Sequence, residues 1–271
     1  MTVSLLDSVS ADLLHALDTG AQITPFSARP GGLSLPDAYR VTAEIRRLRE
    51  ARGERVVGRK IGFTNRTIWD EYNVHAPIWG YVYDTTLHEI AERPDGFALG
   101  HLPEPRIEPE IAFGLRRALR PGLGDADLLD CIEWIAHGFE IVHSPYAGWR
   151  FAPADTVAAF GLHGALLLGP RVPVTGDHGA LARALSRFTI TLYRDGAVAD
   201  RGAAANVLDG PLAALRHLVE VLAADPESPP LGAGEIVTTG TLTRALPIAP
   251  GETWSTELHG LDLPGVSVRF T

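Results

Sequence analysis

The stretch Arg106-Ile107-Glu108-Pro109-Glu110-Ile111-Ala112-Phe113-Gly114 decides how this chain folds, because two acids stand in an otherwise apolar run. The run predicts a strand over residues 106–115. Side chains two apart in a strand leave the same face of a sheet, so Glu108 and Glu110 point the same way, with Cα atoms about 7 Å apart. Pro109 between them donates no ladder hydrogen bond. Two anions side by side repel unless a cation or a shared proton lies between them.

A third acid stands in a similar setting, in Ile135-Ala136-His137-Gly138-Phe139-Glu140-Ile141-Val142. A lone charge inside such an apolar run is costly to bury without a partner. Three carboxylates without a thiolate describe a site for a hard cation, Mg²⁺ or Mn²⁺, with positions left for water and substrate. The sequence therefore predicts that Glu108, Glu110 and Glu140 bind a divalent metal. The alternative is that the first two face solvent and that Glu140 pairs with an arginine.

Lys60 is the one lysine among 24 basic residues, the other 23 being arginine. Arginine thus fills almost every position that needs only a positive charge, and Lys60 stands where a guanidinium does not serve. It lies in Val56–Phe63, which is typical of a short buried strand with close backbone approach at its glycines. Burial is expected to lower the pKa of this amine and to make it a proton shuttle or a carbonyl partner. The alternatives are a lysine that survived drift, or an ion pair with one of the glutamates.

Length and composition are those of a globular protein. The 271 residues suffice for one large domain or two small ones, and 45% hydrophobic with 21% charged residues is ordinary globular composition. A net charge of −9 disfavours nucleic acid and anionic membranes as partners. No apolar run approaches the ~20 residues that cross a bilayer, and the first residues lack a basic signal-peptide start. With Cys131 as the single cysteine, we expect a cytoplasmic protein without disulfides.

Common catalytic and nucleotide-binding motifs are absent from the sequence. It contains none of G-x-G-x-x-G, G-x-x-x-x-G-K-[ST], G-x-S-x-G and H-E-x-x-H. The ten histidines show no metal-ligand spacing among themselves. Dinucleotide binding of the usual type, P-loop chemistry, α/β-hydrolase chemistry and zincin chemistry are therefore disfavoured.

Helical signals gather near the N-terminus. Leucines at helical spacing predict a helix over residues 4–18. A second helix begins with Ser34 as its cap and Pro36 in its first turn, and it ends near Gly53. Three arginines on the side opposite its apolar positions predict a solvated face: Arg46, Arg47 and Arg49.

From Arg55 onward the pattern changes to strands and turns. Besides the runs above, we expect helices over 125–135 and 211–223, and strands over 78–83, 136–142, 166–168, 188–193, 197–199, 235–238, 253–258 and 266–270. Strands outnumber helices and alternate with them irregularly, which fits a doubly wound parallel sheet poorly. The sequence predicts an α+β protein with a helical N-terminal portion, residues 1–53, and a β-rich domain, residues 54–271.

Six segments, taken in order, resemble those of a known family. They are Val57–Thr64, Arg106–Phe113, Phe139–Val142, Asp155–Ala158, Gly210–Leu212 and Gly234–Thr243. Each is weak alone, but together they resemble the 2-keto-4-pentenoate hydratase group, and the resemblance covers about residues 36–260. That group belongs to the fumarylacetoacetate hydrolase superfamily and includes 4-oxalocrotonate decarboxylases.

The resemblance implies a mixed β-roll body as the catalytic domain, with the helical portion before it. It implies a divalent metal, Mg²⁺ or Mn²⁺, held by Glu108, Glu110 and Glu140, with Lys60 beside the substrate. It also implies small 2-oxo or enol acids from aromatic meta-cleavage pathways as substrates, and a homo-oligomer.

Three departures from the family's segments affect the substrate side of the site. His143 stands where the family has Asp, Leu162 and His163 replace two hydroxyl residues, and Pro77–Gly80 lacks an acid. We hypothesise that His163 is catalytic, as an acid–base or carboxylate-binding group, and that His143 and Thr241 bind substrate. The alternative for each histidine is a core residue bonded to a backbone carbonyl.

The predicted reaction is hydration of a 2-hydroxy-2,4-dienoate to a 4-hydroxy-2-oxo acid, with a metal-stabilised enolate and with protons moved by Lys60. The same enolate supports decarboxylation of a 4-oxalocrotonate-like acid. It also supports hydrolytic C–C cleavage of an acylpyruvate-like acid, for which His163 or His143 would activate water. A catalytically silent 2-oxo acid binder is a different class, which the presence of three metal ligands and the amine disfavours.

Overall fold

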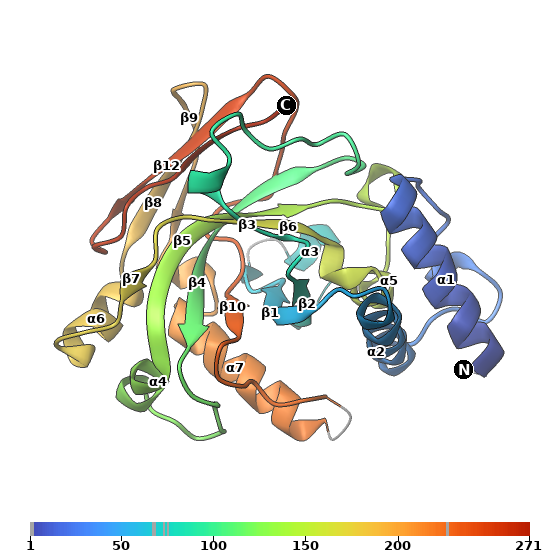
Figure 1. The fold of residues 1–271 in the computed structure, drawn as a ribbon, viewed down its shortest axis with the longest axis horizontal. Helices are drawn as coiled ribbons and strands as arrows, with labels where there is room; N and C mark the ends of the chain where they lie inside the picture. The colour runs from blue at the N-terminus through green and yellow to red at the C-terminus, as the bar shows by residue number, and fades with distance from the viewer. Residues whose placement is uncertain (1–2, 67–68, 73, 75, 226–227) are drawn as a thin grey trace.

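Two groups of helices flank a strongly curled sheet in the computed structural model, with α1, α2 and α5 at one end and α4, α6 and α7 at the other (Figure 1). The structure describes residues 1–271 apart from 1–2, 67–68, 73, 75 and 226–227. The helices are α1 (Val3–Thr19), α2 (Leu35–Ala51), α3 (Trp69–Tyr72), α4 (Asp125–Cys131), α5 (Pro153–Ala158), α6 (His178–Leu185) and α7 (Pro211–Ala224).

The strands form two sheets. The larger has the order β2-β1-β10-β4-β5-β6-β3, with β11 added to β4 and β7 to β5, and the smaller has the order β13-β12-β8-β9. The strands are β1 (Val56–Gly62), β2 (Ile78–Tyr83), β3 (Leu87–Glu89), β4 (Arg106–Leu115), β5 (Ile132–Val142), β6 (His163–Leu168), β7 (Val172–Pro173), β8 (Thr189–Arg194), β9 (Ala197–Ala203), β10 (Ile236–Thr238), β11 (Leu246–Pro247), β12 (Thr253–His259) and β13 (Ser267–Arg269). Parallel pairs (β1 with β10, β3 with β6) stand among antiparallel ones, so the sheet is mixed and the α+β prediction is confirmed.

The antiparallel pair β4–β5 is the spine of the larger sheet. Its ladder runs from Arg106 opposite Val142 to Leu115 opposite Ile132. Most side chains of both strands are buried. On one face, Ile107 packs with residues of the smaller sheet, and Ile111 and Phe113 pack with residues of α7. On the other face, which carries the glutamates, Ala112 and Ala136 pack with residues of β2, β6 and β10. Charged residues in the middle of this pair therefore lie in the interior of the molecule.

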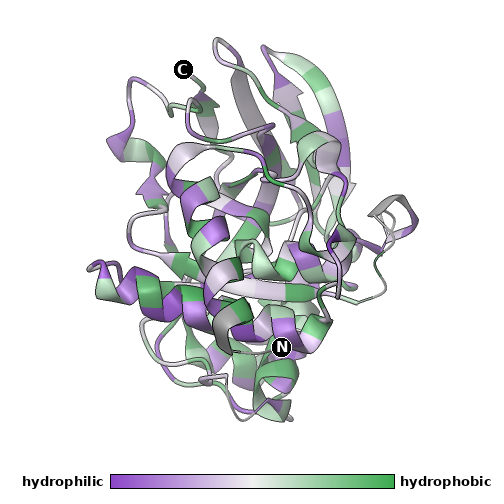
Figure 2. Cartoon of the chain, turned by 90° about the vertical axis from the view of Figure 1, so that its right-hand side faces the viewer, coloured by the Kyte–Doolittle hydropathy of each residue, from purple (hydrophilic) through white to green (hydrophobic). Residues whose placement is uncertain are grey.

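The N-terminal helices lie within about two residues of the predicted bounds, with α1 one residue longer at each end than the predicted 4–18. The Ser34 hydroxyl accepts a hydrogen bond from the backbone N–H of Asp37, Pro36 occupies the first turn, and Gly53 follows the helix with a φ of +92°. Figure 2 views the molecule from this end and shows hydrophobic and hydrophilic residues interspersed along these helices. Apolar residues of α1 and α2 share one core with α5 and with residues 159–162. The division at residue 53 stays a prediction.

The expectation of a solvated Arg49 is wrong. Its side chain is buried, forms an ion pair of 2.5 Å with Glu54, and stacks on the Tyr83 ring, with Cζ 3.7 Å from the ring centroid. A guanidinium can be buried in this way because its flat face packs on an aromatic ring while its edge meets a carboxylate.

The boundaries around residue 130 also differ from the sequence prediction. The helix expected over 125–135 ends at Cys131, and β5 begins at Ile132 rather than at residue 136. Pairing with Leu115 and Gly114 of β4 draws residues 132–135 into the sheet, so tertiary pairing outweighs local helical spacing. Helices α5 and α6 were not expected, and β6 begins at His163, three residues earlier than predicted.

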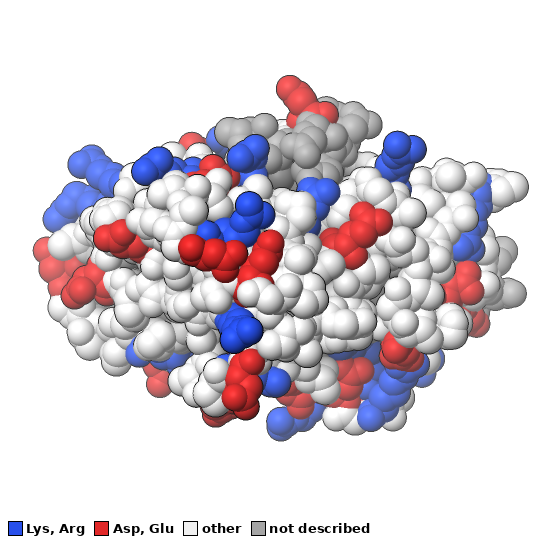
Figure 3. Space-filling model, turned by 90° about the horizontal axis from the view of Figure 1, so that it is seen from above, with Lys and Arg blue, Asp and Glu red and all other residues white. Residues whose placement is uncertain are grey.

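The described residues include no helix that is both long and apolar enough to cross a membrane. Seen from above, the surface carries basic and acidic side chains interspersed with neutral ones (Figure 3).

Candidate metal centre

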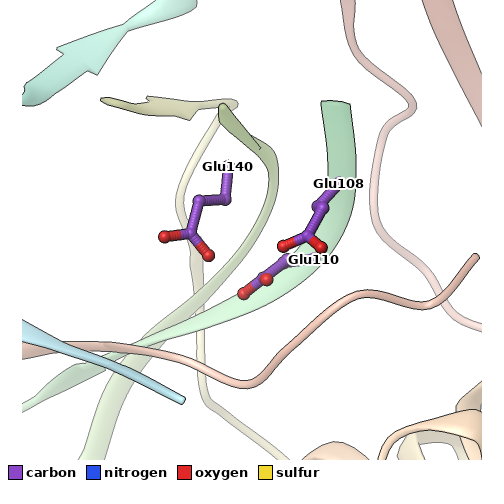
Figure 4. Close-up of side chains that lie close together, drawn as sticks. All are labelled: Glu108, Glu110 and Glu140. Carbon is purple, nitrogen blue, oxygen red and sulfur yellow. The ribbon is translucent and has the colours of Figure 1, made fainter. Parts of the chain in front are cut away.

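The three glutamates predicted as metal ligands converge in the interior of the sheet (Figure 4). Glu108 of β4 and Glu140 of β5 are direct cross-strand partners, and Glu110 lies two residues further along the same face of β4. One carboxylate oxygen from each lies within 4.8 Å of the others. Glu110 and Glu140 are fully buried, and Glu108 is partly exposed. The geometry therefore rejects the alternative in which Glu108 and Glu110 face solvent on the outside of the sheet.

Among the described residues, Glu110 Oε1 has no hydrogen-bond partner, and Glu140 Oε2 has no hydrogen bond but lies 3.2 Å from Lys60 Nζ. The second oxygen of each carboxylate is held by the protein. The backbone N–H of Gly240 donates to Glu110 Oε2 at 2.9 Å, and His163 Nδ1 lies 2.7 Å from Glu140 Oε1. A buried carboxylate oxygen without a partner is costly, and a hard cation removes that cost. Three oxygen donors so arranged fit Mg²⁺ or Mn²⁺.

The pKa shifts of the glutamates also favour a cation at this cluster. Burial raises the pKa of Glu108 to about 7, with the charge of Glu140 adding to the effect against the opposing charge of Lys60. Burial, followed by the charges of Glu140 and Glu108, raises the pKa of Glu110 well above its ordinary value. Without a cation, the protein environment thus disfavours three simultaneous negative charges.

Lys60 of β1 lies beside the cluster. Its buried Nζ donates to the carbonyl oxygen of Gly161 at 3.0 Å and forms an ion pair of 3.2 Å with Glu140 Oε2. Burial acts to lower the pKa of this amine, but the charges of Glu140, Glu108 and Glu110 outweigh it, and the pKa is raised. The expectation of a lowered pKa is therefore wrong, because it considered burial without the three carboxylates. Lys60 is an ammonium group in this environment.

A pocket opens next to Lys60 and Glu108. Its walls are largely apolar, with Lys60, Asn65, Glu108 and Thr241 as the polar residues of the lining. The described residues that line it are Lys60, Gly62, Phe63, Asn65, Ile78, Glu108, Val142, Trp149, Gly161, Leu162, Thr241 and Ala245. The structure thus gathers an amine, a carboxylate cluster and an apolar chamber in one place, which suits a small acid with an apolar tail.

Of the two residues predicted to bind substrate, Thr241 lies at the pocket and His143 does not. Thr241 lines the pocket, and its hydroxyl donates to the carbonyl oxygen of Thr243. His143 is buried but is not among the described residues that line the pocket, and neither of its ring nitrogens has a hydrogen-bond partner among them. Burial lowers the pKa of His143 to about 3. The substrate-binding role of His143 stays a prediction, and no contact among the described residues supports it.

His163 lies behind Glu140 rather than in the pocket lining that the structure describes. Its Nδ1 is at Glu140 Oε1 and its Nε2 is 2.9 Å from the hydroxyl of Thr86. The alternative of a core histidine bonded to a backbone carbonyl does not describe it, since both partners are side chains.

Sequence reasoning missed several groups of the site. Asn65 is buried at the pocket wall, the Gly161 carbonyl holds Lys60, and the Gly240 N–H holds Glu110. The sequence does not reveal the role of a backbone carbonyl or N–H group, because no side-chain type marks it. All three groups could have been suspected only from their position, since they lie in or beside the segments that resemble the family.

Comparisons with known proteins agree with this geometry. No protein-family model matches the chain. The chain is 33% identical over 262 residues to a 2-hydroxyhexa-2,4-dienoate hydratase of Comamonas testosteroni, covering 96% of this chain and 95% of that protein. Its structure is similar to 4-oxalocrotonate decarboxylase from Pseudomonas putida G7 complexed with magnesium and adipate, at 27% identity and a TM-score of 0.89, covering 100% and 99% of the two chains. A fumarylacetoacetate hydrolase family protein from yeast shares the fold alone, at 13% identity and a TM-score of 0.54, covering 78% and 91%.

The fold and the carboxylate cluster define the class as an enzyme with the fumarylacetoacetate hydrolase fold. Within this superfamily, the chain belongs to the family of 2-keto-4-pentenoate hydratases and 4-oxalocrotonate decarboxylases. The resemblance seen in the six segments is thereby confirmed.

Proposed function

We propose that this enzyme is a divalent-metal-dependent hydratase that adds water to a 2-hydroxy-2,4-dienoate and yields a 4-hydroxy-2-oxo acid. The observation that carries the proposal is the convergence of three glutamate oxygens within 4.8 Å, beside Lys60, at one end of an apolar pocket. The 33% identical relative is named as a hydratase of such an acid, which supports the same reaction class.

Glu108, Glu110 and Glu140 are the proposed metal ligands. A divalent cation held there, Mg²⁺ or Mn²⁺, supplies positive charge that stabilises an enolate of a bound 2-oxo acid. The named relative that was solved with magnesium supports this choice of ion. The three carboxylates provide the negative charge that retains the ion in the interior.

Lys60 is the proposed proton carrier. Its ammonium group is oriented by the Gly161 carbonyl and by Glu140, at the wall of the pocket. From there it can donate a proton toward the far carbon of the dienol or hydrogen-bond the substrate oxygen. Protonation of that carbon gives an unsaturated ketone that water attacks. Thr241, at the same wall, is a proposed substrate contact.

The pocket lining favours an apolar substrate tail. Phe63, Ile78, Val142 and Leu162 contribute hydrocarbon surface, and Lys60 is the only basic side chain among the described lining residues. Lys60 is already engaged by Glu140. A second substrate carboxylate would therefore lose its hydration without gaining a cation, which costs several-fold to many-fold in affinity.

Decarboxylation of a 4-oxalocrotonate-like acid is the second candidate, favoured by the TM-score of 0.89 to a decarboxylase. It uses the same enolate and the same ligands. Hydrolytic cleavage of an acylpyruvate-like acid needs a base in the pocket. Neither His143 nor His163 is among the described residues that line it, so we do not propose that reaction.

Product analysis tests the proposal. The purified enzyme with Mg²⁺ is incubated separately with 2-hydroxyhexa-2,4-dienoate, 4-oxalocrotonate and an acylpyruvate. We expect water addition without chain shortening for the first acid, and slower or no turnover of the others. Release of CO₂ from 4-oxalocrotonate as the fastest reaction would assign a decarboxylase, and two fragments from the acylpyruvate would assign a hydrolase. A metal-bound protein inert toward all three would be a silent binder.

Three broader expectations accompany this proposal. We propose a cytoplasmic enzyme of aromatic catabolism that acts on a small molecule and not on nucleic acid or membranes, which the net charge of −9 supports. We propose a homo-oligomer, which light scattering of the purified protein tests. Residues 54–271 are the proposed catalytic domain.

A further inference from the structure

A chain of hydrogen bonds reaches Glu140 from the side away from the pocket. His163 opens β6, the strand paired with β5, and its Nδ1 lies 2.7 Å from Glu140 Oε1. On the other side of the ring, Nε2 lies 2.9 Å from the hydroxyl of Thr86, between β2 and β3. Glu140 and His163 are both buried, so water does not replace these contacts.

The Glu140 carboxylate fixes the direction of the hydrogen bond at Nδ1. A carboxylate oxygen accepts, so His163 Nδ1 carries a proton and donates it to Glu140 Oε1. A neutral ring with its proton on Nδ1 accepts at Nε2, where the Thr86 hydroxyl lies 2.9 Å away. That hydroxyl accepts from the backbone N–H of Tyr83 and lies 3.1 Å from the Tyr83 carbonyl oxygen, so it can donate either to that carbonyl or to His163 Nε2.

The hydrogen bond from His163 determines which oxygen of Glu140 remains for a metal ion. Oε1 accepts from His163, whereas Oε2 has no hydrogen bond among the described residues and faces the Lys60 ammonium at 3.2 Å. Glu110 is treated in the same way, since the Gly240 N–H takes Oε2 and leaves Oε1. Two of the three carboxylates are thus each held through one oxygen, which presents the other in a fixed direction.

We propose that His163, backed by Thr86, is a positioning residue that holds Glu140 Oε1 and so presents Oε2 alone to the divalent cation. This inference rests on the proposed metal site. It assigns to His163 a role different from the acid–base role considered from the sequence. Both ring nitrogens are engaged by side chains, and His163 is not among the described residues that line the pocket.

The test compares metal affinity among paired variants, by calorimetric titration of Mn²⁺ into metal-free protein. His163→Leu removes the donor, and we expect Mn²⁺ affinity to fall by roughly 10–100-fold, as for other lost outer partners of metal ligands. His163→Asn keeps an N–H at the position of Nδ1, and we expect it to restore most of the affinity. His143→Leu is the matched control, because it removes a buried imidazole three residues from Glu140 without touching a carboxylate oxygen that the structure describes. We expect its affinity to equal that of the wild type.

Thr86 supplies a second, milder pair in case His163→Leu does not fold. Thr86→Val removes the hydroxyl at nearly constant shape, and Thr86→Ser keeps it. We expect weaker Mn²⁺ binding in the first and near-normal binding in the second, with thermal unfolding recorded for both. In the wild type, ¹⁵N NMR of labelled histidine should show His163 protonated at Nδ1 and bare at Nε2.

Activity separates positioning from proton transfer. In His163→Leu, we expect the Mn²⁺ concentration for half-maximal activity to rise, with kcat largely recovered at saturating metal. Unchanged Mn²⁺ affinity in both His163→Leu and Thr86→Val would overturn the inference while leaving the metal site intact. A His163 protonated at Nε2 rather than Nδ1 would overturn it as well. A wild-type protein that binds no Mn²⁺ would overturn the metal site itself, and this inference with it.

Discussion

Glu108 of β4 and Glu140 of β5 face each other directly across the antiparallel ladder. Like charges in this relation destabilise a sheet even at its surface, and here both groups lie in the interior. The cost appears in the pKa of Glu108, which burial and the charge of Glu140 raise to about 7. Lys60 offsets part of the charge of the cluster, and a divalent cation would offset the rest. The repulsion among the buried carboxylates without a cation is the reason that we expect this site to bind one.

The stability of the metal-free protein should therefore fall as the pH rises from about 4.5 to 7. Glu108 has a pKa of 4.5 unfolded and about 7 folded. In this window the native state keeps a proton that the unfolded state has released, so the free energy of unfolding falls with pH, by roughly 3 kcal/mol from this group. Urea denaturation in the presence of a chelator measures it. Glu108→Gln should lack this part of the decline, and identical slopes in the two proteins would contradict the assignment.

Lys60→Arg should lower kcat by about 10²- to 10⁴-fold while metal binding persists. The charge is kept, but the guanidinium is larger and does not release its proton, and the space is tight. A Cβ added at Gly161 would already lie 3.0 Å from Lys60 Cδ. Steady-state kinetics with calorimetry checks both parts. Arg55→Lys is the control, since that side chain is 80% exposed and should have no effect. Full activity in Lys60→Arg would remove Lys60 from the mechanism.

Gly240→Ala should weaken both the fold and the metal site. Gly240 has a φ of +99°, an added Cβ would lie 1.8 Å from Thr64 Oγ1, and its N–H holds Glu110. We expect a loss of roughly 1–3 kcal/mol and reduced Mn²⁺ affinity. Gly251→Ala is the control, because Gly251 has a similar backbone conformation, with a φ of +95°, but no atom lies within 4 Å of the added Cβ. It should cost about 1 kcal/mol and leave Mn²⁺ affinity unchanged. Equal affinities in the two variants would show that Gly240 does not position Glu110.

His143→Leu should stabilise the protein in acid. Burial lowers the pKa of His143 from 6.5 to about 3, so below pH 6.5 the unfolded state binds a proton that the native state refuses. The wild type therefore loses stability as the pH falls, whereas His143→Leu does not lose this part, because leucine binds no proton. We expect the difference in the free energy of unfolding to grow from pH 7 to reach roughly 2–3 kcal/mol at pH 4.5. A pH-independent difference between the two proteins would mean that His143 is solvated or hydrogen-bonded in the native state.

Much of the fold and of the charged cluster could be predicted from the sequence. The strand over 106–115 is correct at both ends, because a nearly continuous apolar run, buried without interruption from residue 109 to 115, specifies it locally. The placement of Glu108 and Glu110 on one face follows from strand period alone, and Glu140 stands out by its apolar surroundings. What brings the three together is the register of β4 with β5, which depends on pairing over a distance in the chain.

The errors have the same physical origin. The helix expected over 125–135 lost its last residues to the sheet, and Arg49 is buried by partners, Glu54 and Tyr83, that a helical pattern does not reveal. The pKa of Lys60 was expected to fall because burial is visible in the sequence, whereas the three opposing charges are visible only in the fold. The position of His163 behind Glu140, rather than in the pocket, likewise depends on the pairing of β5 with β6.

Calorimetric titration of Mn²⁺ and Mg²⁺ into the metal-free wild type and Glu110→Gln tests the central claim most directly. Glu110 is buried, points at its two neighbours and leaves one oxygen unpaired, so its loss should affect the ion with little change elsewhere. We predict one ion bound per wild-type chain, with a rise in the temperature of unfolding, and binding abolished or strongly weakened in the variant. No heat of binding and no thermal shift in the wild type, or equal binding by both proteins, would contradict the account.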